Sequence, residues 1–297
     1  MIWSYDGLWQ KTKLYVERAL GEEREGPMFP FWAILALELL GRATLARVHP
    51  ALLADPREGE NLMYAFGFAS SKSPKSIPAA TVFRRCQKIV PDFTEEDANF
   101  CDALISNRNE ELHSGSPIFE DLPTAQWLAR YYRVCGLFLA SQDLTLQDLF
   151  GDAESRAATV LIAAEGAKLT SEAKEKIAAS AKSYASLPAE EQSGKRNAVL
   201  LAVSTSNNGK TIKCPSCGSK AWMFGEPVKT SEPKLAGDSI VTELILIPTR
   251  LACRVCGLEL NGHNLVHAAG LGGQFSITKE EDIFEAYAPD YDEYGND

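Results

Sequence analysis

Residues 29–48, FPFWAILALELLGRATLARV, are apolar on nearly every side in their first half when they are projected onto a helix. A helix that is hydrophobic all round must be buried. The apolar run is interrupted by Pro30 and Glu38 and is too short to span a bilayer, and Pro50 ends the helix. The sequence therefore predicts a helical bundle built around this segment.

Helical spacing extends outward from this segment over most of the first half of the chain. Further helices are expected over residues 6–20, over 79–90, from Thr94 to Gly115, and over 123–141. Thr94 followed by Asp97 is a typical signal for the start of a helix. Residues 152–205, rich in Ala, Glu, Lys and Ser, predict two more helices, the first broken near Gly166.

The pattern changes from helices to strands after residue 206, with short strands expected over residues 220–225 and 240–252. Four parts follow: a helical domain over 1–150, a helical connector over 151–205, a small β domain over 206–279, and an acidic flexible tail over 280–297. The expected fold class is mainly α, and α+β overall.

The chain of 297 residues has a net charge of −10, but this charge is unevenly distributed. Its last 22 residues contain eight acidic and one basic side chain. The acidity therefore argues only against a protein that binds nucleic acid through bulk charge. Two interpretations of the tail stay open, a solubilising end and a segment that restrains a basic site.

Four of the seven cysteines form two C-x-x-C pairs, Cys214-Pro-Ser-Cys217 and Cys253-Arg-Val-Cys256. Each pair can supply two thiolates from one tight turn, and a glycine follows each pair. The spacing resembles that of a zinc ribbon and predicts one structural zinc per chain, with an insertion around residues 226–238. His263 and His267 are expected to be ordinary polar residues rather than spare ligands. Cys86, Cys101 and Cys135 lie in helical stretches and are expected in the core.

A second candidate site lies in the segment Ile105-Ser-Asn-Arg-Asn-Glu-Glu-Leu-His113. Four residues separate Arg108 from His113. A second arginine and histidine with a similar short spacing are Arg42 and His49, which are separated by six residues. The first match is favoured because Asn109 directly follows the arginine and because the segment precedes one last helix. His49, next to Pro50, is expected to serve a helix end.

This segment resembles the R-x4-6-H motif of HEPN domains, helical bundles that are often ribonucleases of host defence and toxin–antitoxin systems. The resemblance covers roughly residues 1–150 and implies a HEPN-like bundle with Arg108, Asn109 and His113 as catalytic residues. It also implies an endoribonuclease that needs no metal, in which the 2′-hydroxyl attacks to leave a 2′,3′-cyclic phosphate. Histidine suits proton transfer near neutral pH, and arginine supplies a permanent cation for the developing charge.

Helix geometry places a constraint on this site. Asn109 and His113 lie about 40° apart on a helix, whereas Arg108 and His113 lie about 140° apart. One straight helix does not aim both at the same phosphate, so a homodimer with a composite site is expected. Glu38 is expected to pair either with Arg42, one turn on, or with an active-site arginine.

The leading prediction is an endoribonuclease that acts on RNA in antiviral defence or growth arrest, with the zinc ribbon as a sensing or targeting module. The alternatives are a catalytically silent HEPN dimer whose zinc ribbon binds protein or nucleic acid, and a zinc-ribbon regulator. The start of the chain shows no secretory leader, and the cysteine usage fits a reducing compartment. A cytoplasmic protein without a membrane partner is therefore expected.

Overall fold

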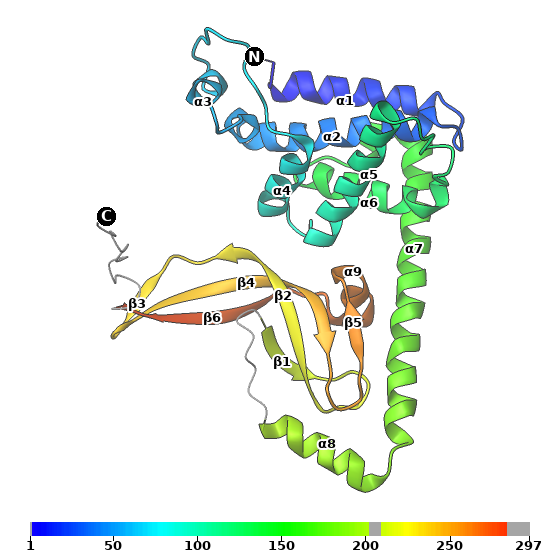
Figure 1. Cartoon of the computed structure of the whole chain (residues 1–297), viewed down its shortest axis with the longest axis vertical. Coiled ribbons are helices and arrows are strands. Elements are labelled where there is room, and N and C mark those ends of the chain that lie inside the picture. Colours follow the sequence, from blue (N-terminus) through cyan, green and yellow to red (C-terminus); the bar gives the residue numbers. More distant parts are fainter. Residues whose placement is uncertain (1, 202–208, 284–297) are drawn as a thin grey trace, which may run out of the picture. The chain divides into compact units, whose positions relative to one another are not determined.

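A computed structural model of the chain describes residues 2–201 and 209–283 (Figure 1). The chain divides into two compact units, Met1–Lys168 and Leu169–Asp297. Helices make up the described part of the first unit, and an antiparallel sheet follows in the second. The predicted layout, mainly helical with a β region near the C-terminus, is confirmed.

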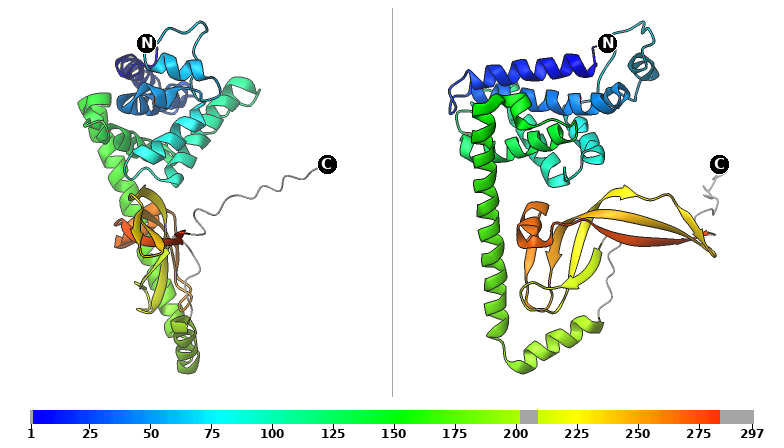
Figure 2. Two further views of the ribbon diagram at one scale, coloured as in Figure 1. Left: turned by 90° about the vertical axis from the view of Figure 1, so that its left-hand side faces the viewer. Right: turned by 180° about the vertical axis from the view of Figure 1, so that it is seen from behind.

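The first unit is a bundle of helices (Figures 1 and 2). Its elements, in chain order, are α1 (Tyr5–Leu20), α2 (Met28–Val48), the 3-10 turn Pro50–Leu53, α3 (Gly59–Ala65), α4 (Ala79–Ile89), α5 (Glu95–His113), the 3-10 turn Thr124–Gln126, α6 (Leu128–Ala140) and the first turns of α7 (Leu146–Ala185). The longer connections lie between α3 and α4 and after α5.

Helix α2 lies at the centre of this unit, as its sequence predicts. Ile34, Leu37 and Leu40 are completely buried, and α1 lies along α2 in each view of Figures 1 and 2. Within the described residues, α2 has the length and composition that could cross a membrane, and 61% of its most apolar window is buried inside the protein. A core helix of a soluble protein passes the same test.

The local signals at helix ends place most boundaries correctly. Thr94 caps α5 in a capping box with Asp97, as predicted. Helix α3 was not expected from the sequence, because it is short and several of its apolar side chains are exposed. The predicted break near Gly166 is wrong: α7 continues through this residue, and the kink lies at Gly151, whose φ is +75°. Glycine adopts such a φ without a steric penalty.

The second unit contains the end of α7, α8 (Ala189–Leu201) and a sheet. Its strands are β1 (Gly209–Lys213), β2 (Lys220–Thr230), β3 (Lys234–Ala236), β4 (Ser239–Ala252), β5 (Glu259–Asn261) and β6 (Phe275–Asp282), with the short helix α9 (His263–Val266) before β6. All pairings are antiparallel in the order β1-β2-β4-β3, and β5 and β6 also pair with β4. Strand β4 is therefore the axis of the sheet (Figure 1).

Two segments differ from their predicted form. The expected insertion over 226–238 consists of an extension of β2 and the short strand β3, because both pair with the long strand β4. Residues 280–282, expected in the flexible tail, belong to β6 and pair with Ser239, Ile240 and Val241. The remainder of the predicted tail from residue 284, and residues 202–208 between the connector and the β domain, lie outside the described residues.

The segment expected as a connector contributes to both hydrophobic cores. Ala158 is buried in the core of the first unit, next to Leu149 and Phe150. Further along, Ala173 and Tyr184 of α7 and Val199 of α8 belong to the core that contains the β strands. The two alanines are small enough to allow close packing, whereas Tyr184 and Val199 fill more of the core.

Candidate functional site

Arg108 lies near the end of α5 and reaches a carboxylate on the central helix. Its Nη1 atom is 3.2 Å from Oε2 of Glu38, and the two side chains are only 13% and 15% exposed. Helix α2 is apolar around Glu38, so burial of this carboxylate requires a compensating charge. Arg108 supplies part of this compensating charge. A residue predicted for the catalytic site therefore also pairs with a largely buried carboxylate of the central helix.

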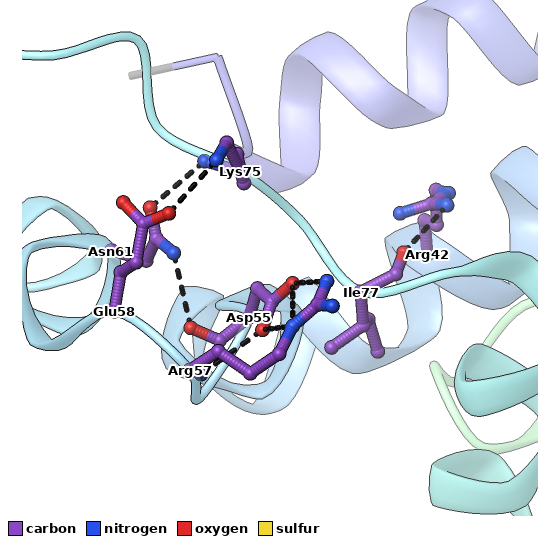
Figure 3. Close-up of polar contacts among 7 residues, drawn as sticks. All are labelled: Arg42, Asp55, Arg57, Glu58, Asn61, Lys75 and Ile77. Atoms are coloured by element: carbon purple, nitrogen blue, oxygen red, sulfur yellow. Dashed lines mark hydrogen bonds and ion pairs between the residues drawn. The ribbon is translucent and has the colours of Figure 1, made fainter.

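Arg42 binds the other oxygen of the same carboxylate. Its Nε and Nη2 atoms donate to Oε1 of Glu38 at 3.0 and 2.8 Å. The guanidinium also donates to the hydroxyl of Ser76 and to the carbonyl of Ile77 at 3.2 and 3.0 Å, the latter drawn in Figure 3. Two arginines therefore share one carboxylate, and the cluster keeps one net positive charge.

Both partners predicted for Glu38 are thus present together. The sequence placed Arg42 one turn after Glu38, a spacing at which side chains meet on a helix. Contact with Arg108 depends on how α5 packs against α2, which the sequence alone does not give. A carboxylate inside an apolar helix was the signal that a buried charge cluster exists at this position.

Asn109 and His113 occupy the exposed part of α5. The amide oxygen of Asn109 accepts a hydrogen bond from Nε of Arg108 at 3.1 Å. His113 is the last residue of the helix, and its exposed side chain forms no hydrogen bond or ion pair with any described residue. The structure brings Arg108 together with Asn109 and Glu38 but not with His113.

The histidine of the alternative Arg42–His49 match has a structural role. His49 is the residue after α2, and its Nδ1 atom accepts the backbone N–H of Ala51 at 3.0 Å. Its ring also contacts Phe66, with 4.7 Å between the ring centroids. These contacts make His49 the N-cap of the following 3-10 turn, which agrees with its expected place at a helix end.

Four cysteines form the second candidate site. The sulfur atoms of Cys214, Cys217, Cys253 and Cys256 all lie within 4.8 Å of one another. Sγ of Cys214 is 3.6 Å from that of Cys256, and Sγ of Cys217 is 3.7 Å from that of Cys253. Each of these short distances joins a cysteine of one pair to a cysteine of the other. The four sulfur atoms therefore form one compact group, which could bind a metal ion with tetrahedral geometry.

Each pair of cysteines sits in the same kind of turn. The N–H of Gly218 donates to the carbonyl of Cys214 at 3.0 Å, and that of Gly257 donates to the carbonyl of Cys253 at 2.9 Å. Both glycines have a positive φ, 72° and 73°, which closes each turn in front of the next strand. This is the role predicted for the glycine after each pair.

The environment of Cys214 favours its thiolate. A hydrogen bond from the Cys253 thiol lowers the pKa of Cys214 to about 5, and the backbone amides of Cys217 and Ser216 add to this effect against burial, which raises the pKa. Thiolate is the form that binds metal. Cys253 and the backbone amides of the turn therefore favour the form of Cys214 that could bind a metal ion.

The other histidines and cysteines do not join this group. His263 is buried, and its Nδ1 atom hydrogen-bonds with the carbonyl of Pro248 at 2.8 Å. The metal-capable group contains only the four cysteines among the described residues. Cys86, Cys101 and Cys135 are fully buried in the helical core, where burial raises the pKa of each thiol. They are core side chains, as predicted.

No family model, curated protein or solved structure matches the chain.

Proposed function

We propose that this protein is a metal-independent endoribonuclease of the HEPN type. The observation that carries the proposal is the cluster of Arg42, Glu38 and Arg108, which retains one net positive charge and contacts the exposed residue Asn109. A phosphodiester is an anion, and its cleavage builds further negative charge on phosphorus oxygens. A fixed arginine stabilises that charge without a metal ion.

Each residue has a separate chemical role in this proposal. His113 accepts the proton of the 2′-hydroxyl or returns a proton to the leaving 5′-oxygen. The 2′-oxygen forms a bond to phosphorus while the bond from phosphorus to the 5′-oxygen breaks, which gives a 2′,3′-cyclic phosphate and a 5′-hydroxyl. Arg108 faces the phosphate, and Asn109 orients its guanidinium through the hydrogen bond to Nε.

Two copies of the chain are needed to complete this site. Arg108 points toward Glu38 on the bundle, whereas His113 is exposed at the end of the helix. A homodimer that places two α5 helices across a twofold axis supplies the histidine of one copy to the arginine of the other. We place this enzyme in the cytoplasm, acting in antiviral defence or toxin-like growth arrest.

The decisive assay uses purified protein and mixed RNAs in the presence of EDTA. We expect wild type to cleave and Arg108→Ala and His113→Ala to lose about 100-fold or more of the rate. His49→Ala is the matched control, because the same residue type there caps a turn, and it should retain activity. Equal cleavage by wild type and both site variants would refute the assignment.

A second candidate function rests on a specific observation. Arg108 is 13% exposed and ion-paired with Glu38, so part of its charge is already neutralised. This arrangement also suits a catalytically silent dimer of helical bundles that displays the β domain as a binding module for protein or nucleic acid. The absence of cleavage by a dimeric, correctly folded wild type would favour this candidate.

We further propose that the four cysteines hold one structural zinc ion. Four thiolates fill the tetrahedral shell and leave no open position for a substrate, so the ion stabilises the fold of the β domain. Elemental analysis should find one zinc per chain, and Cys217→Ser should abolish it. Cys101→Ala removes a thiol in the helical core and should leave the zinc content unchanged. A zinc content unaffected by Cys217→Ser would contradict the assignment.

A further inference from the structure

One face of the sheet in the second unit combines aromatic and cationic side chains. Lys220, Trp222 and Phe224 alternate along β2 and therefore project from the same face. In the register of the sheet, Lys213 lies opposite Lys220, and Arg250 lies opposite Phe224. Residues opposite each other in antiparallel strands share a face. This surface, called here the cationic face, spans three strands.

Aromatic rings hold these cations in place. The Nζ atom of Lys220 and the Cζ atom of Arg254 lie 5.6 and 5.2 Å from the ring centroid of Trp222. The Cζ atom of Arg250 lies 5.7 Å from the ring centroid of Phe224. A ring attracts a cation through its quadrupole but carries no net charge. Contact with a ring therefore positions a cation without neutralising its charge.

Two lysines, Lys213 and Lys220, lie directly opposite each other on β1 and β2. Like charges directly opposite each other on neighbouring strands destabilise a sheet. Neither Lys213 nor Arg254 forms an ion pair within the described residues. A ligand with several negative charges that lies across both strands would contact Lys213 and Arg254, and it would lower the repulsion between the two lysines.

Arg250 is also available to such a ligand. Its only described ion pair is with Glu259 at 3.2 Å, and the two side chains are 49% and 54% exposed. An exposed pair of this kind contributes little stability and exchanges readily. A phosphate can therefore replace Glu259 as the partner of Arg250 at small cost.

A shallow depression continues the cationic face beside Lys220. It has a volume of about 320 Å³ and lies between α8 and the first cysteine turn, with Arg196, Val199, Ser219 and Lys220 in its lining. Arg196 adds a cation from a separate element. This depression is in the size range of small-ligand sites, so it has room for one unit of a polymer.

We propose that the cationic face and this depression bind single-stranded nucleic acid. Phosphates would contact the cations across β1, β2 and β4, and a base would lie on the half-buried ring of Phe224. Trp222 is only 5% exposed, so its ring positions Lys220 and Arg254 rather than stacking on a base. Cations interleaved with aromatic rings favour this ligand over an acidic peptide, which has no bases to stack.

The test measures binding of the zinc-loaded full-length protein to a labelled 20-nucleotide single strand of 2′-O-methyl RNA. This probe lacks the 2′-hydroxyl nucleophile, so binding is scored separately from the cleavage proposed at Arg108 and His113. Wild type should bind, and Lys220→Gln/Arg254→Gln should bind about tenfold more weakly. The slope of log affinity against log salt should fall by about 1.4, or about 0.7 for each lost phosphate contact.

The matched control is Lys229→Gln/Lys234→Gln, which removes the same charge from exposed positions elsewhere in the sheet. It should bind as wild type does. Arg254→Gln alone, in an exposed turn, keeps the test possible if the double variant loses its zinc. A DNA strand of the same sequence distinguishes RNA from any single strand. No binding by wild type at 50 mM salt, equal losses in both double variants, or equal affinity for a duplex or for polyglutamate would overturn the proposal.

Discussion

Glu38 and Arg108 lie 70 residues apart in the chain, yet Oε2 of Glu38 is 3.2 Å from Nη1 of Arg108, with both side chains largely buried. Removing one partner of a buried ion pair leaves an uncompensated charge. Glu38→Gln would leave Arg42 and Arg108 beside each other without a carboxylate. We expect it to lower the free energy of unfolding by about 3 kcal/mol.

A double-mutant cycle separates this coupling from general damage. Arg108→Gln leaves Glu38 paired with Arg42 and should cost about 1 kcal/mol. The double variant should lose less than the sum of the two single variants, by at least 0.5 kcal/mol, because Arg108→Gln removes one of the two cations that Glu38→Gln leaves without a carboxylate. Arg84→Gln, at the more exposed pair with Asp102, is the control and should cost less than about 1 kcal/mol. Strict additivity would show that the contact carries no coupling energy.

The contact between Glu38 and Arg108 also shows which features of the structure the sequence can predict. The central helix, the Arg42–Glu38 spacing and the two cysteine pairs depend on neighbours a few residues away, and local patterns predict them. Contact between Glu38 and Arg108 depends on the packing of two helices that are far apart in sequence. Helix α3 was not predicted because several of its apolar side chains are exposed, so they do not follow the periodic pattern of a buried helix face. Phe66, which follows the helix, is 57% exposed.

The proposed homodimeric site leads to a prediction that a site within a single copy would not satisfy. Arg108→Ala and His113→Ala proteins, each inactive alone, should recover RNA cleavage when they are co-expressed as mixed dimers. Random assembly makes half of the dimers mixed, and one of two sites in each is intact, so about a quarter of wild-type activity is expected. The homodimer of the double variant Arg108→Ala/His113→Ala is the control, and it should not cleave RNA. If the mixed sample stays inactive although mixed dimers form, arginine and histidine act within one copy.

The close approach of β2 to β4 at Gly225 leads to a third prediction. A Cβ atom at this position would lie 2.5 Å from the carbonyl oxygen of Ile247 and 3.0 Å from the ring of Phe275. Gly225→Ala must therefore shift the backbone where the register of the two strands changes, and it should cost about 3 kcal/mol. Gly273→Ala, which meets no atom within 4 Å, is the control and should be nearly neutral. Denaturant unfolding compares the free energies of unfolding of the two variants with that of wild type.

The loop that follows α2 contains a carboxylate whose ionisation should be visible in the acid stability of the protein. Side-chain hydrogen bonds from Arg57, together with its backbone N–H, lower the pKa of Asp55 to about 2 (Figure 3). An aspartate in an unfolded chain has a pKa near 4. The folded state therefore binds this proton less readily than the unfolded state, and the resulting stabilisation is complete above about pH 4 and is lost as the pH falls toward 2.

Asp55→Asn should consequently be less stable than wild type at pH 7, and the difference should shrink between about pH 4 and pH 2. Urea unfolding at a series of pH values measures it. Glu120→Gln, at an exposed carboxylate with no ion pair in the described part of the chain, is the control and should track wild type throughout. The side-chain amide of Asn61 donates to the backbone carbonyl of Asp55 at 3.1 Å, a hydrogen bond that the substitution does not remove. Helix α3 should therefore keep its position in the variant. A difference that is constant from pH 7 to pH 2 would mean that Asp55 stabilises the loop by shape and not by charge.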